Sequence, residues 1–287
     1  MKKTLTPTLL CLGLLTACTP LEEDQPSRIT DTRILAIKAT PAEARPGQSV
    51  RFTALIADPQ GPIDAGQRLN WALCLAPKPP TENNSVVDDC LGDEAVTALG
   101  QGTEIEAVLP AQGCQLFGPL SPGPGLRPRD ADITGGYYQP MRLSVEDTVG
   151  FGLERLRCDL AQAPLQIAQA FEGTYQDNLN PSIESLDAPE ALSASQTVTL
   201  TLTTDAPEPY VRFDAITRAL VEDQEALTVS WFATGGQLQA SRSSVRDQQV
   251  QVQWTAPGQA GEHWLFGVLR DSRGGVDFVQ HKISVTP

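Results

Sequence analysis

Two histidines, His263 and His281, are the side chains best suited to acid–base chemistry near neutral pH. A Ser–His–Asp hydrolase would need one of them beside a nucleophile, and a metalloprotease would need the spacing His-Glu-x-x-His. The sequence has no such spacing, no Gly-x-Ser-x-Gly turn, no phosphate-binding glycine loop and no dinucleotide fingerprint. His281 shares the alternation of Ile283 and Val285, which indicates a hydrogen-bonded structural histidine near a strand end. The sequence therefore predicts no catalytic residue.

Pairs of acidic residues could hold calcium or hydrolyse a glycosidic bond. They are Asp88-Asp89, Asp93-Glu94 and the pair Asp130 and Asp132. Calcium needs six to eight oxygen ligands, and Asp130-x-Asp132 before Gly135-Gly136 is only a fragment of such a loop. A glycan hydrolase needs two carboxylates roughly 5–10 Å apart across the substrate bond. We interpret these acids as solvated loop charges and predict no metal and no cofactor. An envelope glycan hydrolase that uses loop carboxylates is retained as an alternative.

Four cysteines in the body of the chain could form disulfides: Cys74, Cys90, Cys114 and Cys158. An even number in an exported domain predicts two bonds. Of the three connectivities, we favour Cys74–Cys90 with Cys114–Cys158, because each bond closes a shorter stretch than the crossed pairings do. A metal site is the alternative, but it lacks a Cys-x-x-Cys pair and both histidines lie far along the chain.

Tyr137 and Tyr138 follow Gly135-Gly136 at the end of a long connection, 115–139. That connection and the earlier one, 76–91, are rich in Pro, Gly and Asp, and loops of this length are usually functional or disordered. Paired tyrosines on a loop can offer amphipathic contact area to a protein or a sugar. The alternative is that they anchor the loop on its own domain.

The amino terminus carries another reactive cysteine. Lys2 and Lys3 precede an apolar stretch, 5–15, which ends in Leu15-Thr16-Ala17-Cys18. This stretch has the length of the apolar region of a secretory signal and is too short to span a bilayer. The basic start, the apolar stretch and the cysteine occur in this order, and together they resemble the signal and lipobox of bacterial lipoproteins. The resemblance implies cleavage before Cys18, acylation of Cys18 (palmitate and a diacylglycerol) and a membrane anchor in the cell envelope.

The residues around Cys18 leave one alternative open and indicate which membrane would carry the anchor. An ordinary secretory signal with a chance Cys18 is the alternative interpretation. In enteric lipoproteins an aspartate after the cysteine retains the protein in the inner membrane, so Thr19 favours the outer membrane.

The excess of acidic over basic residues limits the classes of partner that the chain could bind. Lys and Arg number 21 against 35 Asp and Glu, a formal net charge of −14. This argues against nucleic acid as a partner, because its backbone requires clustered positive charge. An anionic membrane surface would also repel the chain, so membrane attachment depends on the lipid.

The elements that position these residues are mostly strands. Val198, Leu200 and Leu202 alternate with threonines, and the segment 249–254 alternates glutamines with Val and Trp. This period of two is typical of a strand with one buried face. Short strands 8–12 residues apart predict an all-β fold of two immunoglobulin-like β-sandwich modules. Helical spacing over 163–175 predicts a short interdomain helix.

These patterns divide the chain into five parts. They are a signal peptide, a flexible tether, an N-terminal sandwich with long disulfide-bearing loops, a helix with its linker, and a C-terminal sandwich. Their bounds are 1–17, 18–31, 32–162, 163–181 and 182–287.

The C-terminal module carries a recognisable series of motifs. They are the segment Ser230–Gly236, the run Trp254-Thr255-Ala256-Pro257, the aromatic strand with Trp264 and Phe266, and the Asp271 turn. The series resembles bacterial immunoglobulin-like domains of the polycystic-kidney-disease repeat type. The whole arrangement is also similar to lipoproteins of unknown function from gliding and predatory bacteria. The resemblance implies a fold and names no ligand.

The sequence thus predicts a lipid-anchored envelope lipoprotein that is not an enzyme. We expect it to bind a protein or glycan partner through its immunoglobulin-like modules. A purely structural spacer lipoprotein is the other non-catalytic alternative.

Overall fold

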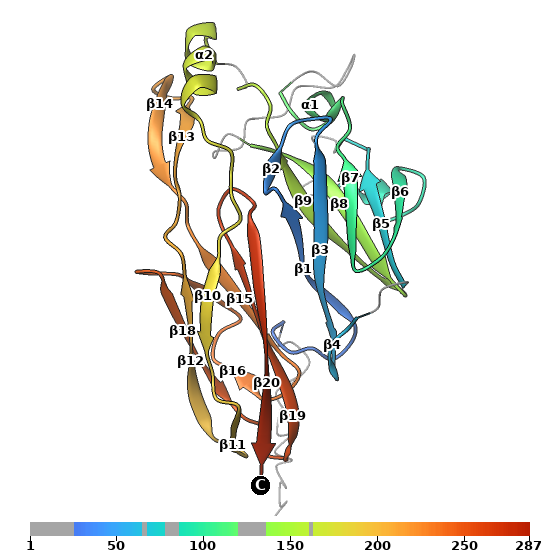
Figure 1. Cartoon of the computed structure of the whole chain (residues 1–287), viewed down its shortest axis with the longest axis vertical. Helices are drawn as coiled ribbons and strands as arrows, with labels where there is room; N and C mark the ends of the chain where they lie inside the picture. Colours follow the sequence, from blue (N-terminus) through green and yellow to red (C-terminus); the bar gives the residue numbers. More distant parts are fainter. Residues whose placement is uncertain (1–25, 65–67, 78–85, 120–135, 161–162) are drawn as a thin grey trace, which may run out of the picture.

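The computed structural model describes residues 26–64, 68–77, 86–119, 136–160 and 163–287. Two β-sandwich modules make up most of the fold, and the short helix α2 (Leu165–Thr174) lies between them in the sequence (Figure 1). The predicted fold class, all-β with two immunoglobulin-like sandwiches and a short interdomain helix, is confirmed.

The first module packs two sheets face to face. Its strands are β1 (Arg33–Thr40), β2 (Glu43–Ala44), β3 (Ser49–Asp58), β4 (Gly61–Pro62), β5 (Leu69–Cys74), β6 (Val96–Gln101), β7 (Glu104–Val108), β8 (Tyr137–Val145) and β9 (Thr148–Leu156). One sheet has the order β1-β3-β4 with β7 also on β3, and the other has the order β2-β9-β8-β5-β6. Phe52, Trp71 and Leu143 are buried in the core of this module, because alternate residues of their strands point inward.

Both disulfides lie in the first module. Cys74–Cys90 joins the end of β5 to the 3-10 helix η2 (Asp88–Cys90). Cys114–Cys158 joins the one-turn helix α1 (Gly113–Leu116) to the residues after β9. The favoured connectivity is therefore confirmed. Cys74–Cys90 closes the connection 76–91, and Cys114–Cys158 fixes the start of the connection 115–139.

The second module also has two sheets. Its strands are β10 (Ile183–Asp187), β11 (Ala191–Ser193), β12 (Thr197–Thr204), β13 (Pro209–Asp214), β14 (Ala219–Gln224), β15 (Thr228–Ala233), β16 (Gln237–Leu238), β17 (Arg242–Ser244), β18 (Gln249–Thr255), β19 (Gly261–Arg270) and β20 (Val276–Thr286). The sheet orders are β10-β12-β18-β16 and β11-β20-β19-β15-β17. Register between β12 and β18 sets Leu200 against Val252 on the buried face and Thr201 against Gln251 on the outer face. The hairpin β13–β14 projects beyond the sandwich, near α2 (Figure 1).

The segment before β1 differs from the expected tether. The Ala233 amide donates to the Ser27 carbonyl at 2.8 Å, and the Ile29 amide donates to the Ala233 carbonyl at 2.9 Å. Residues 27–29 therefore run beside β15 of the second module, and the Ile29 side chain is buried. A flexible tether over all of 18–31 is wrong for this stretch, because backbone hydrogen bonds and an apolar side chain hold it. Residues 18–25 lie outside the described part of the chain.

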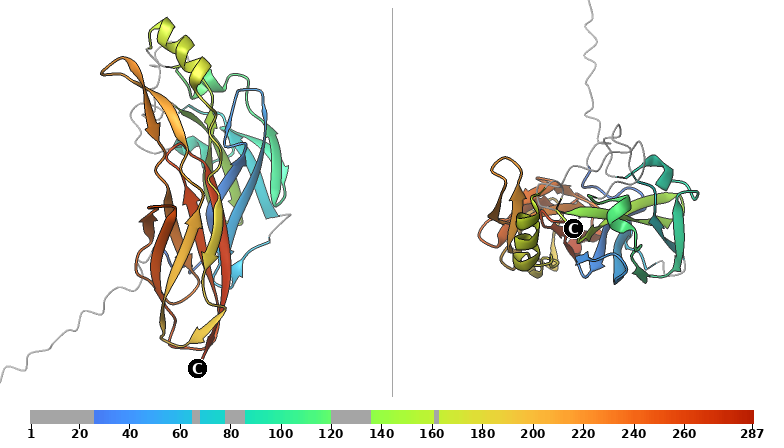
Figure 2. Two further views of the ribbon diagram at one scale, coloured as in Figure 1. Left: turned by 60° about the vertical axis from the view of Figure 1, so that its left-hand side comes forward. Right: turned by 90° about the horizontal axis from the view of Figure 1, so that it is seen from above.

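The two modules meet at an apolar junction. Leu35 and Leu55 of the first module cluster with Phe266 and Val268 of the second, and Ile29 completes the cluster. All five side chains are buried. Figure 2 shows the modules side by side along their length. Because apolar burial stabilises this arrangement, the surfaces beside the junction keep a defined shape.

Candidate functional site

A groove of about 400 Å³ lies at the junction of the modules. Its lining comes from β1, the start of β8 and part of β9 in the first module, and from the β19–β20 turn of the second. Ile34, Ile37, Tyr138, Leu153 and Ser272 are among its lining residues. Clefts of this size at domain interfaces are common binding sites.

Two glycines of β9 let β1 approach closely. A Cβ atom at Gly152 would lie 2.7 Å from Cγ2 of Ile37, and one at Gly150 would lie 3.1 Å from Cβ of Ile34. Carbon atoms in favourable contact are ~3.5–4.0 Å apart, so side chains at both positions would push the strands apart. The spacing Gly-x-Gly places both glycines on one face of β9, against β1. Phe151, Gly152 and Leu153 of this strand, together with β1, form the first wall of the groove.

The turn between β19 and β20 forms the opposite wall. Oδ1 of Asp271 accepts the amides of Arg273 and Gly275, each at 2.8 Å. Gly274 has a φ of 108°, and a Cβ there would lie 3.1 Å from the Tyr138 ring. Glycine is required at this position both for its backbone conformation and for the approach of Tyr138. The predicted hairpin connection over 271–275 is confirmed.

A buried charge network lies behind Tyr138. Arg155 is fully buried, and its Nε lies 3.2 Å from Oε2 of Glu43. Nη1 of Arg155 donates to the Tyr138 hydroxyl at 3.1 Å and to the Arg273 carbonyl at 3.3 Å. Burial disfavours the charge, but the neighbouring Tyr175 and Glu43 hold the pKa of Arg155 above its ordinary value. The guanidinium therefore stays charged, paired with a carboxylate as a buried charge must be.

Tyr175 joins that pair to the second module. Its hydroxyl donates to Glu43 at 2.7 Å and accepts from Nη2 of Arg155 at 3.2 Å and from Nη1 of Arg273 at 3.3 Å. Nε of Arg273 in turn donates to Glu225 at 2.7 Å. Burial raises the pKa of Tyr175 to about 12, so the hydroxyl stays protonated and can donate. One linker side chain thus holds charged groups of both modules.

The two tyrosines that the sequence singled out have different positions. Both belong to β8 rather than to a loop. Tyr137 is buried in the core of the first module (3% exposed), so it has no surface to offer a partner. Tyr138 is half-buried and lines the groove, with the Arg155 guanidinium 5.9 Å from its ring centre. They differ because successive residues of a strand point to opposite faces.

Polar groups of the groove are largely engaged within the protein. Nη2 of Arg270 donates to the Leu35 carbonyl at 3.0 Å. Oγ of Ser272 accepts the Ala226 amide at 3.2 Å, and Asp271 accepts the two amides of its own turn. Most of the other lining side chains are aliphatic or aromatic. The groove therefore suits an apolar side chain better than a ligand rich in hydroxyl groups.

The acidic pairs of the first module lie elsewhere. Asp88 and Asp89 belong to η2, and the exposed Asp93 pairs with Arg142 at 2.8 Å. The neighbouring Glu94 is exposed. The calcium-like fragment with Asp130 and Asp132 lies outside the described residues. Within the described ranges, no three His, Cys, Asp or Glu side chains gather closely enough to hold a metal ion.

The histidines lie apart from the groove. Nε2 of His281 lies 3.1 Å from the Pro189 carbonyl, which fits the structural role expected for it. His263 lines a separate pocket of the second module. Cys18, the predicted lipidation site, lies outside the described residues. Among the described residues, no helix combines the length and the apolar character that crossing a bilayer requires.

The charge network was not found from the sequence. Its members come from β2, β8, β9, the linker, the β14–β15 connection and the β19–β20 turn, and the sequence gives no sign that these segments meet. Arg155 lies in the run Glu154-Arg155-Leu156-Arg157, and nothing in this run indicates that its side chain is buried. Alternation alone would assign it to a solvent-exposed face.

The solved structures named below are only distantly similar to this chain. No family model matches it, and neither does any curated protein. Similar solved structures include native E. coli alpha-2-macroglobulin (12% identity, TM-score 0.28), the D00–D0 domain of intimin (9%, 0.26) and a conjugative transposon lipoprotein from Bacteroides eggerthii (14%, 0.25). The alignments cover 92%, 90% and 36% of this chain, and 17%, 99% and 94% of those chains. A likeness this distant carries no argument about function.

Proposed function

We propose that this chain is a non-catalytic lipoprotein of the bacterial cell envelope that binds a partner protein in the groove between its immunoglobulin-like modules. The observation that carries the proposal is the position of Tyr138. Its half-buried ring lines an open groove, while hydrogen bonds link its hydroxyl to Arg155 and to the Arg273 carbonyl. An aromatic side chain fixed in this way presents contact area at a small cost in conformational entropy.

A protein segment fits the groove better than a glycan. Ile34 and Leu153 supply aliphatic surface, and the polar groups beside them already have partners. A glycan would bring hydroxyl groups that find few free donors or acceptors there, and unpaired polar groups lower affinity. An apolar side chain of a partner would instead displace water from apolar surface.

The amino-terminal sequence supports the anchor. The signal and lipobox-like run before Cys18 imply lipidation, and Thr19 favours the outer membrane. Disulfides persist in oxidising compartments, so Cys74–Cys90 and Cys114–Cys158 agree with export. The eight residues from Cys18 to Gln25 reach at most about 28 Å when extended, which keeps the modules close to the membrane.

The absence of enzyme activity is part of the proposal. Within the described ranges, His281 contacts the Pro189 carbonyl, and neither histidine hydrogen-bonds a Ser, Thr or Cys side chain, as a nucleophile–base pair would require. A glycan hydrolase is the competing enzyme class and a structural spacer the competing non-enzyme class. The immunoglobulin-like module of the polycystic-kidney-disease type remains our prediction for the second sandwich.

The test compares two substitutions of leucine by aspartate. Leu153→Asp places a charge in the groove, and Leu165→Asp places the same charge on the exposed start of α2. After in-cell crosslinking and purification of the full chain, we expect Leu153→Asp to reduce recovery of the partner protein at least tenfold. Leu165→Asp should leave recovery unchanged, and both variants should melt within a few degrees of the native chain. Equal recovery with both variants would refute binding in the groove, and no recovery with the native chain would favour the spacer.

A further inference from the structure

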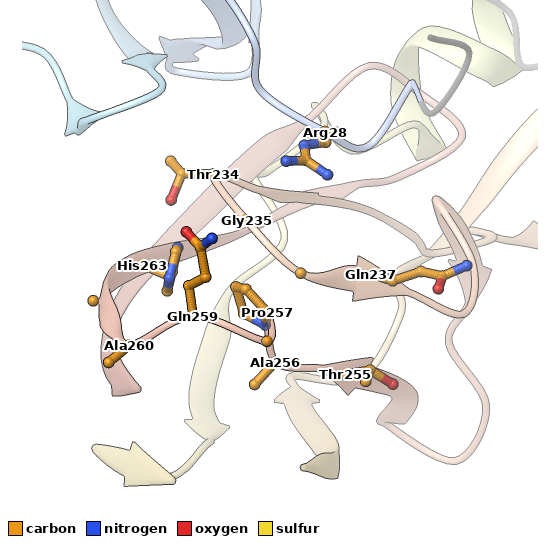
Figure 3. Close-up of a pocket in the computed structure, with 13 residues that line it drawn as sticks. Arg28, Thr234, Gly235, Gln237, Thr255, Ala256, Pro257, Gln259, Ala260 and His263 are labelled. Atoms are coloured by element: carbon orange, nitrogen blue, oxygen red, sulfur yellow. The ribbon is translucent and has the colours of Figure 1, made fainter. Parts of the chain in front are cut away.

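A second concave site lies at the end of the second module, away from the groove. Its volume is about 510 Å³, within the range of small-molecule sites. Two loops form most of it: the turn 234–237 between β15 and β16, and the loop 255–261 between β18 and β19. Arg28, from the segment before the first module, completes the lining (Figure 3).

Two glycines in the turn 234–237, Gly235 and Gly236, pack closely against Trp254 and hold the turn in place. Nε1 of Trp254 donates to the Gly235 carbonyl at 3.0 Å. Gly236 has a φ of 72°, and a Cβ there would lie 2.7 Å from the same indole nitrogen. Because Trp254 is fully buried, the turn rests on the core of the module and its position is fixed.

Arg28 is held beside the turn by its neighbours. The Ser27 carbonyl accepts the Ala233 amide and the Ile29 amide donates to the Ala233 carbonyl, and Ala233 directly precedes Thr234. Among the residues that the structure describes, no acidic side chain forms an ion pair with Arg28. In a chain with a net charge of −14, this is a guanidinium left available for an anion.

The other polar groups of the site are uncharged. Burial and the nearby Arg28 lower the pKa of His263, so its imidazole is neutral at neutral pH. Gln237 and Gln259 contribute carboxamides, which both donate and accept hydrogen bonds, and Thr234 contributes a hydroxyl. Figure 3 shows His263 and Gln259 on one side of the turn and Arg28 on the other.

The side chains that line this pocket favour a ligand with one negative charge and several hydroxyl groups. A guanidinium can pair with a carboxylate or a phosphate. One guanidinium balances the single charge of a carboxylate, whereas a phosphate dianion would leave one negative charge unbalanced in a chain of net charge −14. The imidazole and carboxamides match hydroxyl groups, which also donate and accept. The apolar side chains of the site, Ala256, Pro257 and Ala260, are too small to cover a fatty acyl chain.

From these contacts we propose that the pocket formed by Arg28, Thr234, Gln237, Gln259 and His263 binds a sugar acid, a hexose unit that carries one carboxylate. The carboxylate lies against Arg28, and the ring hydroxyls lie against His263 and the glutamines. Arg28 belongs to the segment that docks on β15, so the site is complete only when that segment is in place. The proposal is independent of partner binding in the groove.

The test is calorimetric titration of the full chain in detergent with glucuronate, with glucose and acetate as the matched probes. We expect glucuronate to bind at least tenfold more tightly than either comparison ligand. Arg28→Gln, which removes the charge and keeps a carboxamide, should weaken glucuronate binding at least tenfold. Arg246→Gln is the control, because Arg246 is exposed on the same module and does not line the pocket.

The outcomes separate the parts of the proposal. Binding of glucose as tightly as glucuronate would overturn the role of Arg28. Binding of acetate as tightly as glucuronate would overturn the sugar and leave a simple anion site. No heat with glucuronate, or equal loss of affinity in Arg28→Gln and Arg246→Gln, would overturn the site. Gln259→Ala, on an exposed loop, should weaken glucuronate binding without changing the melting temperature.

Discussion

The Tyr175 hydroxyl donates to Glu43 at 2.7 Å and accepts from Arg273 at 3.3 Å. Glu43 belongs to the first module and Arg273 to the second, so one buried hydroxyl connects charged groups of both. The groove that we propose as a binding site lies beside this connection, and its shape depends on it.

The first prediction concerns that hydroxyl. Tyr175→Phe should lower the free energy of unfolding by about 1–3 kcal/mol, because it leaves buried charged groups short of a partner. A double-mutant cycle with Glu43→Gln isolates the contact, and we expect a coupling energy of about 1 kcal/mol or more. Denaturant unfolding provides the measurement. Additive effects of the two substitutions would show that the hydroxyl does not join the modules.

The second prediction concerns two glycines that lie in different environments. Gly152→Ala should destabilise the chain by about 1–3 kcal/mol, because the added Cβ meets Ile37 at the packed contact of β1 with β9. Gly173→Ala is the matched control in α2, where a Cβ would meet nothing within 4 Å. It should stabilise the helix by up to about 1 kcal/mol. Thermal melting of both variants tests this, and an unchanged or raised melting temperature in Gly152→Ala would contradict the close packing of β1 on β9.

The third prediction concerns pH. Burial, together with the nearby Glu43, raises the pKa of the Glu154 carboxyl well above its ordinary value of 4.5. Burial and Asp271 raise the pKa of Glu225 to about 7, although the contact with Arg273 opposes this. The folded chain therefore binds protons that the unfolded chain has released above about pH 4.5. For Glu225, the stabilisation is complete below that pH and is lost as pH rises to about 7, at most ~1.4 kcal/mol per pH unit.

Glu154→Gln separates the contribution of one group. Glu154 is buried beside Gln139 in the register of β8 and β9, and within the described residues neither of its oxygens has a hydrogen-bond partner. A neutral glutamine should therefore make the chain more stable than the native chain at pH 8, with the difference shrinking toward pH 5. Chemical denaturation at several pH values measures this, with the exposed Glu222→Gln as control. Parallel stability curves for Glu154→Gln and the native chain would refute the shift.

The fourth prediction concerns the disulfides. Cys114–Cys158 closes a separation of 44 residues and Cys74–Cys90 one of 16. If the disulfides stabilise the fold mainly by restricting the unfolded chain, removing Cys114–Cys158 should lower the free energy of unfolding by ~0.9 kcal/mol more than removing Cys74–Cys90 does. Paired alanine substitutions at each bond, compared by denaturant unfolding, measure the difference. A larger loss at Cys74–Cys90 would show that packing around η2 dominates instead.

The fifth prediction concerns the anchor. Cys18→Ala should abolish incorporation of a labelled fatty acid and move the chain from the membrane fraction to the soluble fraction. The second disulfide pair provides a control, because a chain without Cys114 and Cys158 should still take up label. Label in Cys18→Ala would contradict anchoring at this residue.

Much of the fold could be predicted from the sequence because its signal is local. Alternation in residues 197–204 and 249–255 defines two paired strands directly, and the connection 271–275 marks a hairpin. The disulfide pairing followed from loop length. Each of these features depends on residues near one another in the chain or on simple counting.

The groove could not be predicted, because it depends on contacts between distant segments. Tyr138 faces Gly274 across the module junction, and nothing near either residue records that approach. The burial of Ile29 against β19 could not be predicted either, because no nearby residue indicates it. This burial holds part of the expected tether against the second module. Tyr137 and Tyr138 looked equivalent in the sequence, but they are successive residues of β8 and their side chains point to opposite faces of the strand.

Binding in the groove is tested most directly by site-specific photo-crosslinking in living cells. A photoreactive residue replaces Ser272 in the groove or, in a second strain, the exposed Ile216 at the tip of the β13–β14 hairpin. We predict a discrete protein adduct from position 272 that disappears when Leu153→Asp is added, and no such adduct from position 216. An adduct from 216 with none from 272, or an adduct from 272 that survives Leu153→Asp, would contradict binding in the groove.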